Sequence, residues 1–359
     1  MENIKFNFTK NIDGILVTTP ENIRWISGFK GSFGLVLLKK NGEKILISDG
    51  RYAENAKRTL KVNCEARENA LGQTKEWKFQ IFDKDFKKNF GEKVSGSFWI
   101  EDLASLADLK KYKKFFPNIK FFPKTNFLEE KRSIKTEIEI DKVRIAQNHV
   151  DDLLIPFLKT KLRENVTEKL LAFELEHAIR DNGKFDISFD AIVAFGENSS
   201  LPHHHPSEKK LKKGDNILID CGAKFEGYHS DMTRNFVFGT AKADYINKFN
   251  ICLNAQKKVL AQYKVGKKIK DLENFCRKSL GEEEKYFTHS LGHGVGLQIH
   301  EIPSISIKSK DKLIENQIVT CEPGLYYPDN FGIRIEDLLV IRKNGPEILS
   351  QTKKELILF

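Results

Sequence analysis

Two aspartates, Asp220 and Asp231, have the residue type and the spacing for chemistry in this 359-residue sequence. The apolar run 216–219 predicts a buried strand and ends directly on Asp220, Gly222 and Gly227 indicate a turn, and Asp231 then opens a second strand-like run. We therefore expect both carboxylates near the facing ends of two neighbouring strands. Two carboxylates buried side by side are unfavourable unless a cation binds them. This stretch predicts a cation site that other parts of the chain must complete.

The end of the chain resembles this central stretch. In residues 316–322, a short apolar strand after an Asn closes on a Cys beside Glu322, much as residues 216–221 do. A further strand is predicted over 332–340 and carries Glu336. The acids of the two pairs are spaced differently, so the likeness is partial. It indicates two related halves, each of which directs a pair of carboxylates at one centre.

One histidine has the surroundings to join these acids. His293 lies in the run Gly-His-Gly-Val-Gly over 292–296, where small residues allow close approach of the backbone. Four carboxylates and one imidazole are too anionic for a single zinc ion, but they suit two divalent ions that share bridging carboxylates. Two such ions can bind a water, lower its pKa and stabilise an oxyanion. The candidate ligands are Asp220, Asp231, His293, Glu322 and Glu336.

Each of these residues also has a simpler explanation when it is taken alone. An acid at the end of a strand is commonly a turn former or an ion-pair partner, and His293 could be an ordinary loop residue. Together, however, the acids fall in strands that are otherwise apolar, where an uncompensated charge is costly. The joint pattern therefore favours a metal site.

Charge and composition exclude several other classes of function. The 60 Lys and Arg residues are dispersed among 50 Asp and Glu residues without a long basic run, so we expect no nucleic-acid partner despite a net charge of +10. No apolar run approaches the ~18 residues that span a bilayer, and the first residues lack the layout of a secretory signal. We expect a cytoplasmic protein without a membrane partner. Scattered cysteines without CxxC spacing predict reduced thiols: Cys64, Cys221, Cys252, Cys276 and Cys321.

The elements that position the candidate ligands fall into two predicted domains, 1–125 and 126–359. The first is predicted to be an α/β domain without a catalytic cluster, with strands over 13–17, 34–38, 45–47 and 97–100 and a helix over 103–112. The second begins with a helix whose capping box is formed by Thr136 and Glu139. Its remaining predicted helices cover 168–180, 244–263 and 269–280, and a strand is predicted over 187–195.

With these motifs in place, the sequence resembles the pita-bread metallopeptidases, specifically the Xaa-Pro peptidases (aminopeptidase P and prolidase). The likeness covers nearly the whole chain. Residues 20–23, 27–29 and 49–52 are similar to the creatinase-type N-terminal domain. The resemblance implies an α+β fold, in which a creatinase-like α/β N-terminal domain is followed by a pita-bread catalytic domain with pseudo-two-fold halves. The catalytic motifs are Ile219–Gly222, Ser230–Arg234, Gly292–Gly296, Glu322–Gly324 and Arg334–Asp337.

The resemblance also implies a role for each metal ligand. Asp220 would bind one metal ion, and Asp231 and Glu336 would bridge both. His293 and Glu322 would complete the second site. Glu322 would also act as general base toward a bridging water. The implied cofactor is two divalent metal ions, manganese by expectation, with cobalt or zinc as alternatives.

Three further residues gain catalytic roles from the resemblance. His203, which follows Pro202 directly, would contact the substrate or the leaving amine, although His204 and His205 leave the choice among the three histidines open. His300 would stabilise the tetrahedral intermediate. Arg334 would bind a bridging carboxylate and hold it in place without binding the metal itself.

The implied activity is hydrolysis of the bond between an N-terminal residue and a following proline. The main expectation is an Xaa-Pro aminopeptidase that acts on peptides with proline at the second position, and residues 49–52 favour it. The alternative is an Xaa-Pro dipeptidase (prolidase), since the run 289–293 also occurs in prolidase-like sequences. A more remote alternative is a non-catalytic binding protein on the same scaffold, but such relatives usually lose metal ligands. A homodimer is expected.

Overall fold

The computed structural model describes residues 7–61 and 77–359. The chain divides into two compact units, Met1–Arg132 and Ser133–Phe359, and the boundary predicted after residue 125 lies in the same part of the chain. Cys64 falls outside the described residues. Among the described helices, none is long and apolar enough to cross a membrane.

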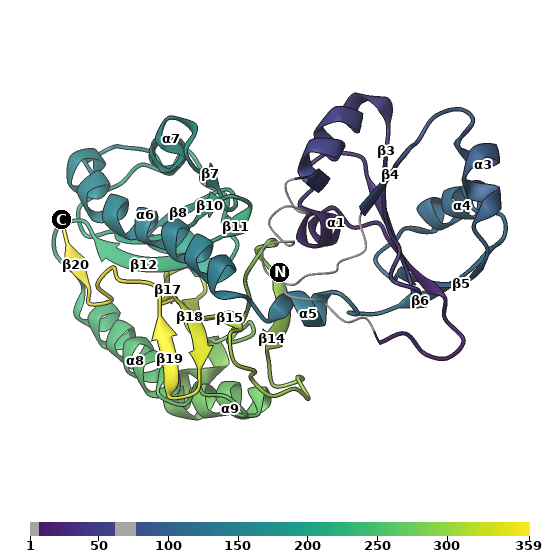
Figure 1. Cartoon of the computed structure of the whole chain (residues 1–359). Helices are drawn as coiled ribbons and strands as arrows, with labels where there is room; N and C mark the ends of the chain where they lie inside the picture. Colours follow the sequence, from purple (N-terminus) through teal and green to yellow (C-terminus); the bar gives the residue numbers. More distant parts are fainter. Residues whose placement is uncertain (1–6, 62–76) are drawn as a thin grey trace. The chain divides into compact units, whose positions relative to one another are not determined.

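The first unit is built on a six-stranded sheet in the order β4-β3-β2-β1-β5-β6. β1 is antiparallel to β2 and parallel to β5, and the strands predicted over 34–38 and 45–47 form the antiparallel pair β2–β3. Its strands are β1 (Gly14–Val17), β2 (Leu35–Lys39), β3 (Lys44–Ser48), β4 (Trp77–Ile81), β5 (Gly96–Glu101) and β6 (Ile119–Lys124). Its helices include α1 (Pro20–Ser27), α3 (Phe86–Asn89) and α4 (Leu106–Phe115), and α5 (Glu129–Ser133) ends it (Figure 1).

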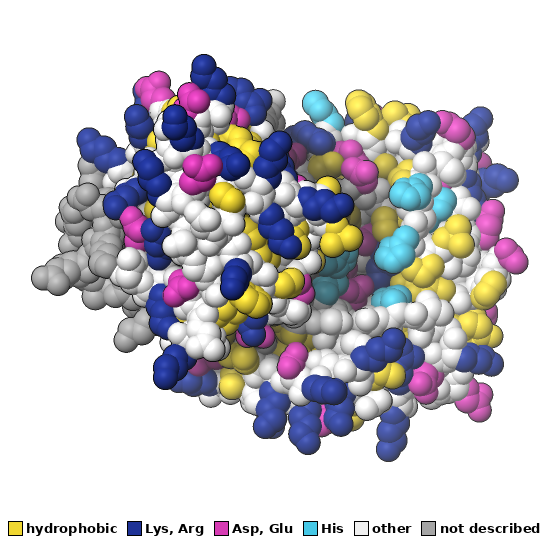
Figure 2. All heavy atoms as spheres, turned by 90° about the vertical axis from the view of Figure 1, so that its right-hand side faces the viewer, with side chains coloured by type: hydrophobic (Ala, Val, Ile, Leu, Met, Phe, Trp, Pro, Cys, Tyr) yellow, Lys and Arg dark blue, Asp and Glu magenta, His cyan; other side chains and the backbone are white. Residues whose placement is uncertain are grey.

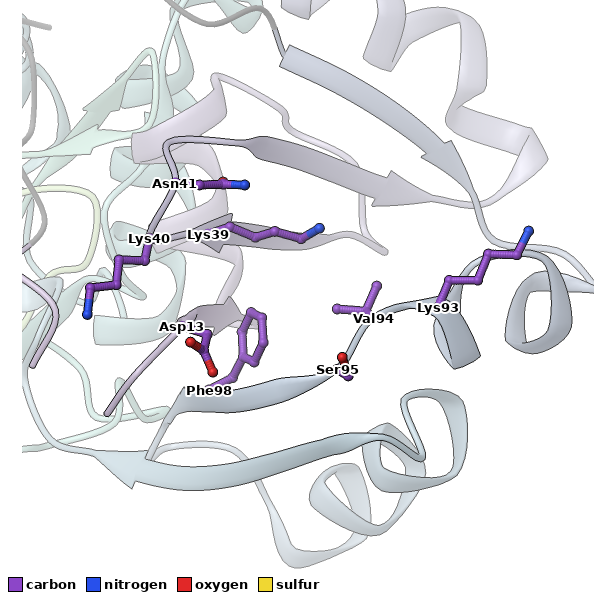
Figure 3. A pocket seen from close by; sticks show the side chains of 8 residues that line it. All are labelled: Asp13, Lys39, Lys40, Asn41, Lys93, Val94, Ser95 and Phe98. Atoms are coloured by element: carbon purple, nitrogen blue, oxygen red, sulfur yellow. The ribbon is translucent and has the colours of Figure 1, made fainter. Parts of the chain in front are cut away.

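A polar hollow of about 510 Å³ lies at one end of this sheet. Lysines and Asp13 line it, and Figure 3 shows the Lys93 side chain directed away from Asp13. A carboxylate oxygen of Asp13 already accepts a hydrogen bond from the Ser97 amide at 2.8 Å. The hollow therefore lacks the convergent acids of a metal site.

The first half of the second unit packs two helices against a four-stranded sheet. The predicted capping box is confirmed at the start of α6 (Glu137–Lys161), and α7 (Glu168–Arg180) has its predicted bounds. Buried apolar side chains of both helices pack on the sheet in one hydrophobic core. The sheet order is β20-β12-β9-β8, with β8 (Ile192–Phe195), β9 (Asn216–Cys221), β12 (Met232–Val237) and β20 (Ile357–Leu358); a small sheet beside it contains β7 (Asp186–Ile187), β10 (Ala223–Phe225) and β11 (Tyr228–His229).

The second half repeats this layout. The helices α8 (Ala243–Leu260) and α9 (Ile269–Leu280) share a second hydrophobic core with the strands beside them (Figure 1). The five-stranded sheet has the order β14-β13-β15-β18-β19, and β16 pairs with β17 separately. The strands are β13 (Gly292–Gly294), β14 (Glu301–Ile305), β15 (Ile318–Cys321), β16 (Gly324–Tyr327), β17 (Phe331–Arg334), β18 (Asp337–Arg342) and β19 (Gly345–Ile348).

The single strand predicted over 332–340 is wrong, because the chain changes partners at Glu336. β17 pairs with β16, whereas β18 pairs with β15. Between them, the Glu336 amide donates to the Thr233 carbonyl at 3.2 Å, and the Ile335 amide donates to the Pro323 carbonyl. The strand predicted over 187–195 is likewise split, into β7 and β8. The break at Glu336 frees this residue from the ladder and places it where the two halves meet.

Candidate metal centre

The register of β9 and β12 brings the first two candidate ligands together. Asp220 lies near the end of β9, and Asp231 directly precedes the first residue of β12. The two strands are antiparallel, with Met232 opposite Cys221. Both carboxylates therefore lie at the same end of this strand pair, as the sequence predicts.

The pair β15–β18 repeats this arrangement in the other half. Glu322 directly follows β15, and Glu336 directly precedes β18. Cys321 lies opposite Asp337 in the antiparallel register. Each half thus presents two acids at one end of two neighbouring strands.

His293 is held in β13 by close backbone contacts. A Cβ on Gly292 would lie 2.4 Å from the Thr320 carbonyl oxygen, and one on Gly294 would lie 2.4 Å from the Ile302 carbonyl oxygen, so neither position accepts a side chain without movement. The imidazole Nδ1 bonds the Gly294 carbonyl at 3.0 Å. Since a carbonyl only accepts, Nδ1 carries the proton and the lone pair of Nε2 faces the acids.

The distances between these groups suit a shared cation. The His293 Nε2 lies 3.5 Å from Asp231 Oδ2 and 3.4 Å from Glu322 Oε1. Among the described residues, Asp231, His293 and Glu336 form a group whose ligand atoms all lie within 4.8 Å of one another. Ligands about 2.1 Å from one ion at ordinary coordination angles are about 3.0–3.4 Å apart. The cluster therefore has the spacing of a coordination shell.

The pKa values of the cluster also indicate that a positive charge would stabilise it. Burial, together with the neighbouring carboxylates, raises the pKa of Asp231 and of Glu336 well above the usual range. Burial raises the pKa of Glu322 to about 7 and lowers that of His293, which keeps the imidazole neutral. The buried Oδ1 of Asp220 has no hydrogen-bond partner among the described residues. Divalent ions would relieve all of these costs, so the residues fit the metal pair that the sequence predicts.

Arg334 supports two of the acids. Its Nη2 donates to Asp220 Oδ2 at 2.7 Å, and its Nε donates to the Thr233 hydroxyl at 3.0 Å. That hydroxyl in turn donates to Glu336 Oε2 at 2.7 Å. Arg334 therefore contacts Asp220 directly and Glu336 through Thr233.

His300 and His203 are both exposed. The ring of His300 makes an edge-to-face contact with the ring of His293, with centroids 4.3 Å apart. His203 follows Pro202, whose carbonyl accepts a hydrogen bond from Arg334 Nη1 at 3.1 Å. All nine histidines of the sequence belong to the second unit, and Figure 2 shows several of them gathered on one face.

The structure separates the three consecutive histidines. His204 Nε2 bonds Glu168 Oε2 at 2.8 Å, and its side chain is only 8% exposed. His203 and His205 are exposed. His204 is therefore occupied by its hydrogen bond to Glu168. His203 is the histidine that directly follows Pro202, whose carbonyl binds Arg334.

One supporting residue, Tyr326, is missed by the sequence analysis. The Tyr326 hydroxyl accepts from Arg334 Nη1 at 2.9 Å and donates to His289 Nε2 at 2.9 Å. Burial lowers the pKa of His289 to about 3, so this imidazole is neutral and can accept. Thr233 lies within the predicted motif Ser230–Arg234, but Tyr326 carries no sequence signal, because its partners are defined only by the β16–β17 pairing.

Comparison with known proteins assigns the family. Residues 141–343 match the model of metallopeptidase family M24, and residues 8–134 match the creatinase/prolidase N-terminal domain. The chain belongs to metallopeptidase family M24. This M24 chain is 32% identical over 363 residues to an Xaa-Pro dipeptidase of Pyrococcus horikoshii, covering 99% of this chain and 97% of that one.

Solved structures agree with this assignment. An Xaa-Pro dipeptidase from Bacillus anthracis superposes with a TM-score of 0.87 at 32% identity, covering 97% of this chain and 95% of that one. An X-Pro aminopeptidase from Thermotoga maritima superposes with a TM-score of 0.84 at 31% identity, covering 97% and 98%. The predicted metallopeptidase and its two-domain pita-bread fold are thereby confirmed, and the family implies divalent metal ions. The relatives named dipeptidase favour the alternative of the sequence analysis.

We predict that Mn²⁺ binding releases more protons at pH 6 than at pH 8. The raised pKa of Glu322, about 7, keeps this carboxyl protonated at pH 6 in metal-free protein, and a bound cation must displace that proton. The affinity for Mn²⁺ should accordingly fall as the pH drops below 7. Isothermal titration calorimetry in buffers of different ionisation enthalpy measures the released protons. Glu322→Gln should reduce the difference between the two pH values, and equal release by the unsubstituted protein at both would contradict the prediction.

Proposed function

We propose that this M24 chain is a dinuclear-metal Xaa-Pro dipeptidase, which hydrolyses the bond between an N-terminal residue and a C-terminal proline. The observation that carries the proposal is the convergence of three buried carboxylates, the half-buried Glu322 and one neutral imidazole at the ends of two strand pairs. Relatives that match nearly the full length of the chain at 32% identity are named Xaa-Pro dipeptidases, which supports the dipeptide as substrate.

The proposed ligands are Asp220, Asp231, His293, Glu322 and Glu336. Their oxygen-rich set favours manganese, with cobalt or zinc as alternatives. When bound, the two ions would supply a water of lowered pKa and an electrophile for the substrate carbonyl. The remaining chemistry falls to side chains of this chain.

Glu322 is the proposed general base. Its carboxylate would lie beside the metal-bound water, where it can accept a proton and return it to the leaving proline nitrogen. The Thr320 hydroxyl donates to its Oε1 at 3.0 Å and orients it. The same oxygen lies 3.4 Å from His293 Nε2, which places it in the cluster of proposed ligands.

The proposed roles of the other residues follow from their contacts. His300, adjacent to His293, would stabilise negative charge developing on the substrate carbonyl oxygen. His203 would contact the substrate or the leaving amine. Arg334 would keep Asp220 and, through Thr233, Glu336 in place.

The aminopeptidase stays as a second candidate, since the Thermotoga maritima X-Pro aminopeptidase is about as similar to this chain as the dipeptidases are. Both activities need the same metal pair and differ in whether the substrate continues after proline. The expected homodimer stays a prediction.

Substrate length distinguishes the two candidates. We expect metal-loaded protein to hydrolyse Ala-Pro and to leave Ala-Pro-Ala intact. Ala-Ala is the control for the proline requirement, and liberated amino acids can be quantified by chromatography. Cleavage of Ala-Pro-Ala as fast as Ala-Pro would establish the aminopeptidase instead.

Loss of a proposed ligand should abolish turnover. We expect Asp231→Asn and His293→Ala to lower kcat/KM by more than the roughly 10–100-fold typical of residues that only support ligands. Elemental analysis should show less than two bound ions per chain. His177→Ala, an exposed histidine on α7, is the matched control and should retain activity. Unchanged turnover in both ligand variants would refute the metal centre.

The consecutive histidines should respond differently to substitution. His203→Ala should lower kcat/KM without changing the free energy of unfolding, because its side chain is exposed. His204→Ala should lower the free energy of unfolding by about 1–3 kcal/mol, because it removes a hydrogen bond to the buried Glu168. Denaturant titration and initial rates test both. The reverse pattern would show that His204 is the catalytic histidine.

A further inference from the structure

A buried ion pair, Arg234–Asp337, lies directly behind the proposed metal ligands. Arg234 belongs to β12, which begins after Asp231, and Asp337 is the first residue of β18, directly after Glu336. The Arg234 Nη2 lies 2.8 Å from Asp337 Oδ1, and the side chains are 2% and 0% exposed. Each member of the pair is therefore close in sequence to one of the two acids proposed to bridge the ions: Arg234 to Asp231, and Asp337 to Glu336.

Every N–H group of the Arg234 guanidinium has an acceptor. Nε and Nη2 donate to the Thr352 carbonyl at 3.0 and 2.8 Å, and the second Nη2 hydrogen goes to Asp337. Nη1 donates to the Thr233 carbonyl at 3.1 Å and to the Glu336 carbonyl. A planar guanidinium has five such donors, whereas a lysine ammonium has three without a fixed plane. Only arginine can make this full set at this position.

These bonds converge on the point where the two halves of the site meet. The Glu336 amide donates to the Thr233 carbonyl at 3.2 Å, and the Thr233 hydroxyl donates to Glu336 Oε2 at 2.7 Å. Arg234 binds the carbonyls of these same two residues. It thereby holds the Glu336 carbonyl directly, and it also holds the Thr233 carbonyl of β12, which accepts from the Glu336 amide.

Asp337 keeps the guanidinium in this orientation. Its second oxygen, Oδ2, accepts from Gln256 Nε2 at 2.8 Å and from Lys354 Nζ at 2.5 Å. The buried carboxylate is thus fully engaged and balanced by two cations. A buried ion pair is weak support for stability, because well-packed apolar side chains commonly stabilise as much. Its geometric precision is the property that an apolar pair would lack.

We propose that Arg234, oriented by Asp337, is a positioning residue that sets the separation of the Asp231 and Glu336 carboxylates, so that both can bind the same pair of divalent ions. The inference rests on the proposed metal centre. It assigns to the opposite face of the strands a function that a purely structural ion pair would not have. Neither residue touches the substrate or the ions.

Metal affinity tests the proposal in the full-length protein. Arg234→Lys keeps the charge but loses part of the donor set, and we expect its affinity for Mn²⁺ to fall about 10–100-fold, as for residues that orient ligands. Calorimetric titration of metal-free protein measures this affinity. The matched control is Arg342→Lys, at the other end of β18, whose guanidinium bonds Glu137, Glu347 and Asn316; it should bind Mn²⁺ as the unsubstituted protein does.

Thermal unfolding distinguishes positioning from general stabilisation. The rise in Tm on saturation with Mn²⁺ should be smaller in Arg234→Lys than in the unsubstituted protein, because this rise depends on the affinity of the folded state. A lower Tm of the metal-free variant with unchanged Mn²⁺ affinity would overturn the proposal. If Arg234→Lys does not fold, Asp337→Asn, of nearly equal size, decides by the same criteria.

The test of Mn²⁺ affinity can be interpreted separately from the test of peptidase activity. Protein that binds Mn²⁺ but does not cleave Ala-Pro would refute the peptidase proposal and leave the affinity comparison valid. Protein that binds no divalent ion would refute both. A normal peptidase in which Arg234→Lys keeps full Mn²⁺ affinity would refute the positioning role alone.

Discussion

The repulsion among four carboxylates in a water-poor interior is the constraint on which the catalytic unit depends. Without cations, burial and then the neighbouring carboxylates raise the pKa of Asp231, Glu322 and Glu336 and favour their neutral forms. The surrounding structure opposes this with a neutral imidazole, an arginine on Asp220 and a hydroxyl on Glu336. These supports are too few to compensate four charges, which is the physical reason that the residues fit cations rather than a simple hydrogen-bonded core.

The two halves of the second unit place their acids in the same way. In each, two antiparallel neighbours (β9 with β12, and β15 with β18) end in a pair of acids, and a helix pair covers the core beside them. The connection between the halves is made by backbone groups as well as by side chains. The change of strand partner at Glu336 lets one residue belong to the second half and bond Thr233 of the first.

The residues that carry chemistry were more predictable than those that support them. Acids in apolar strands are recognisable because burial makes them costly, and the bounds of α7 and α9 follow from their periodicity and end signals. The break at Glu336 was missed, because the alternation of residues 332–340 continues through it. Arg234 lies within the predicted motif Ser230–Arg234, but its contacts and those of Tyr326 were not predictable, since Asp337, Thr352 and His289 become their partners only when distant strands pair. The motifs left the choice between aminopeptidase and dipeptidase open, and the relatives named Xaa-Pro dipeptidase favour the second.

The backbone around His293 leaves this residue almost no room for adjustment. With glycines pressed against the Thr320 and Ile302 carbonyls, β13 cannot shift without opening the sheet. The imidazole is therefore the rigid reference point of the centre. Accommodation of ions with different radii must come from rotation of the acidic side chains, so that exchange of one transition metal for another would alter carboxylate geometry while the nitrogen stays in place.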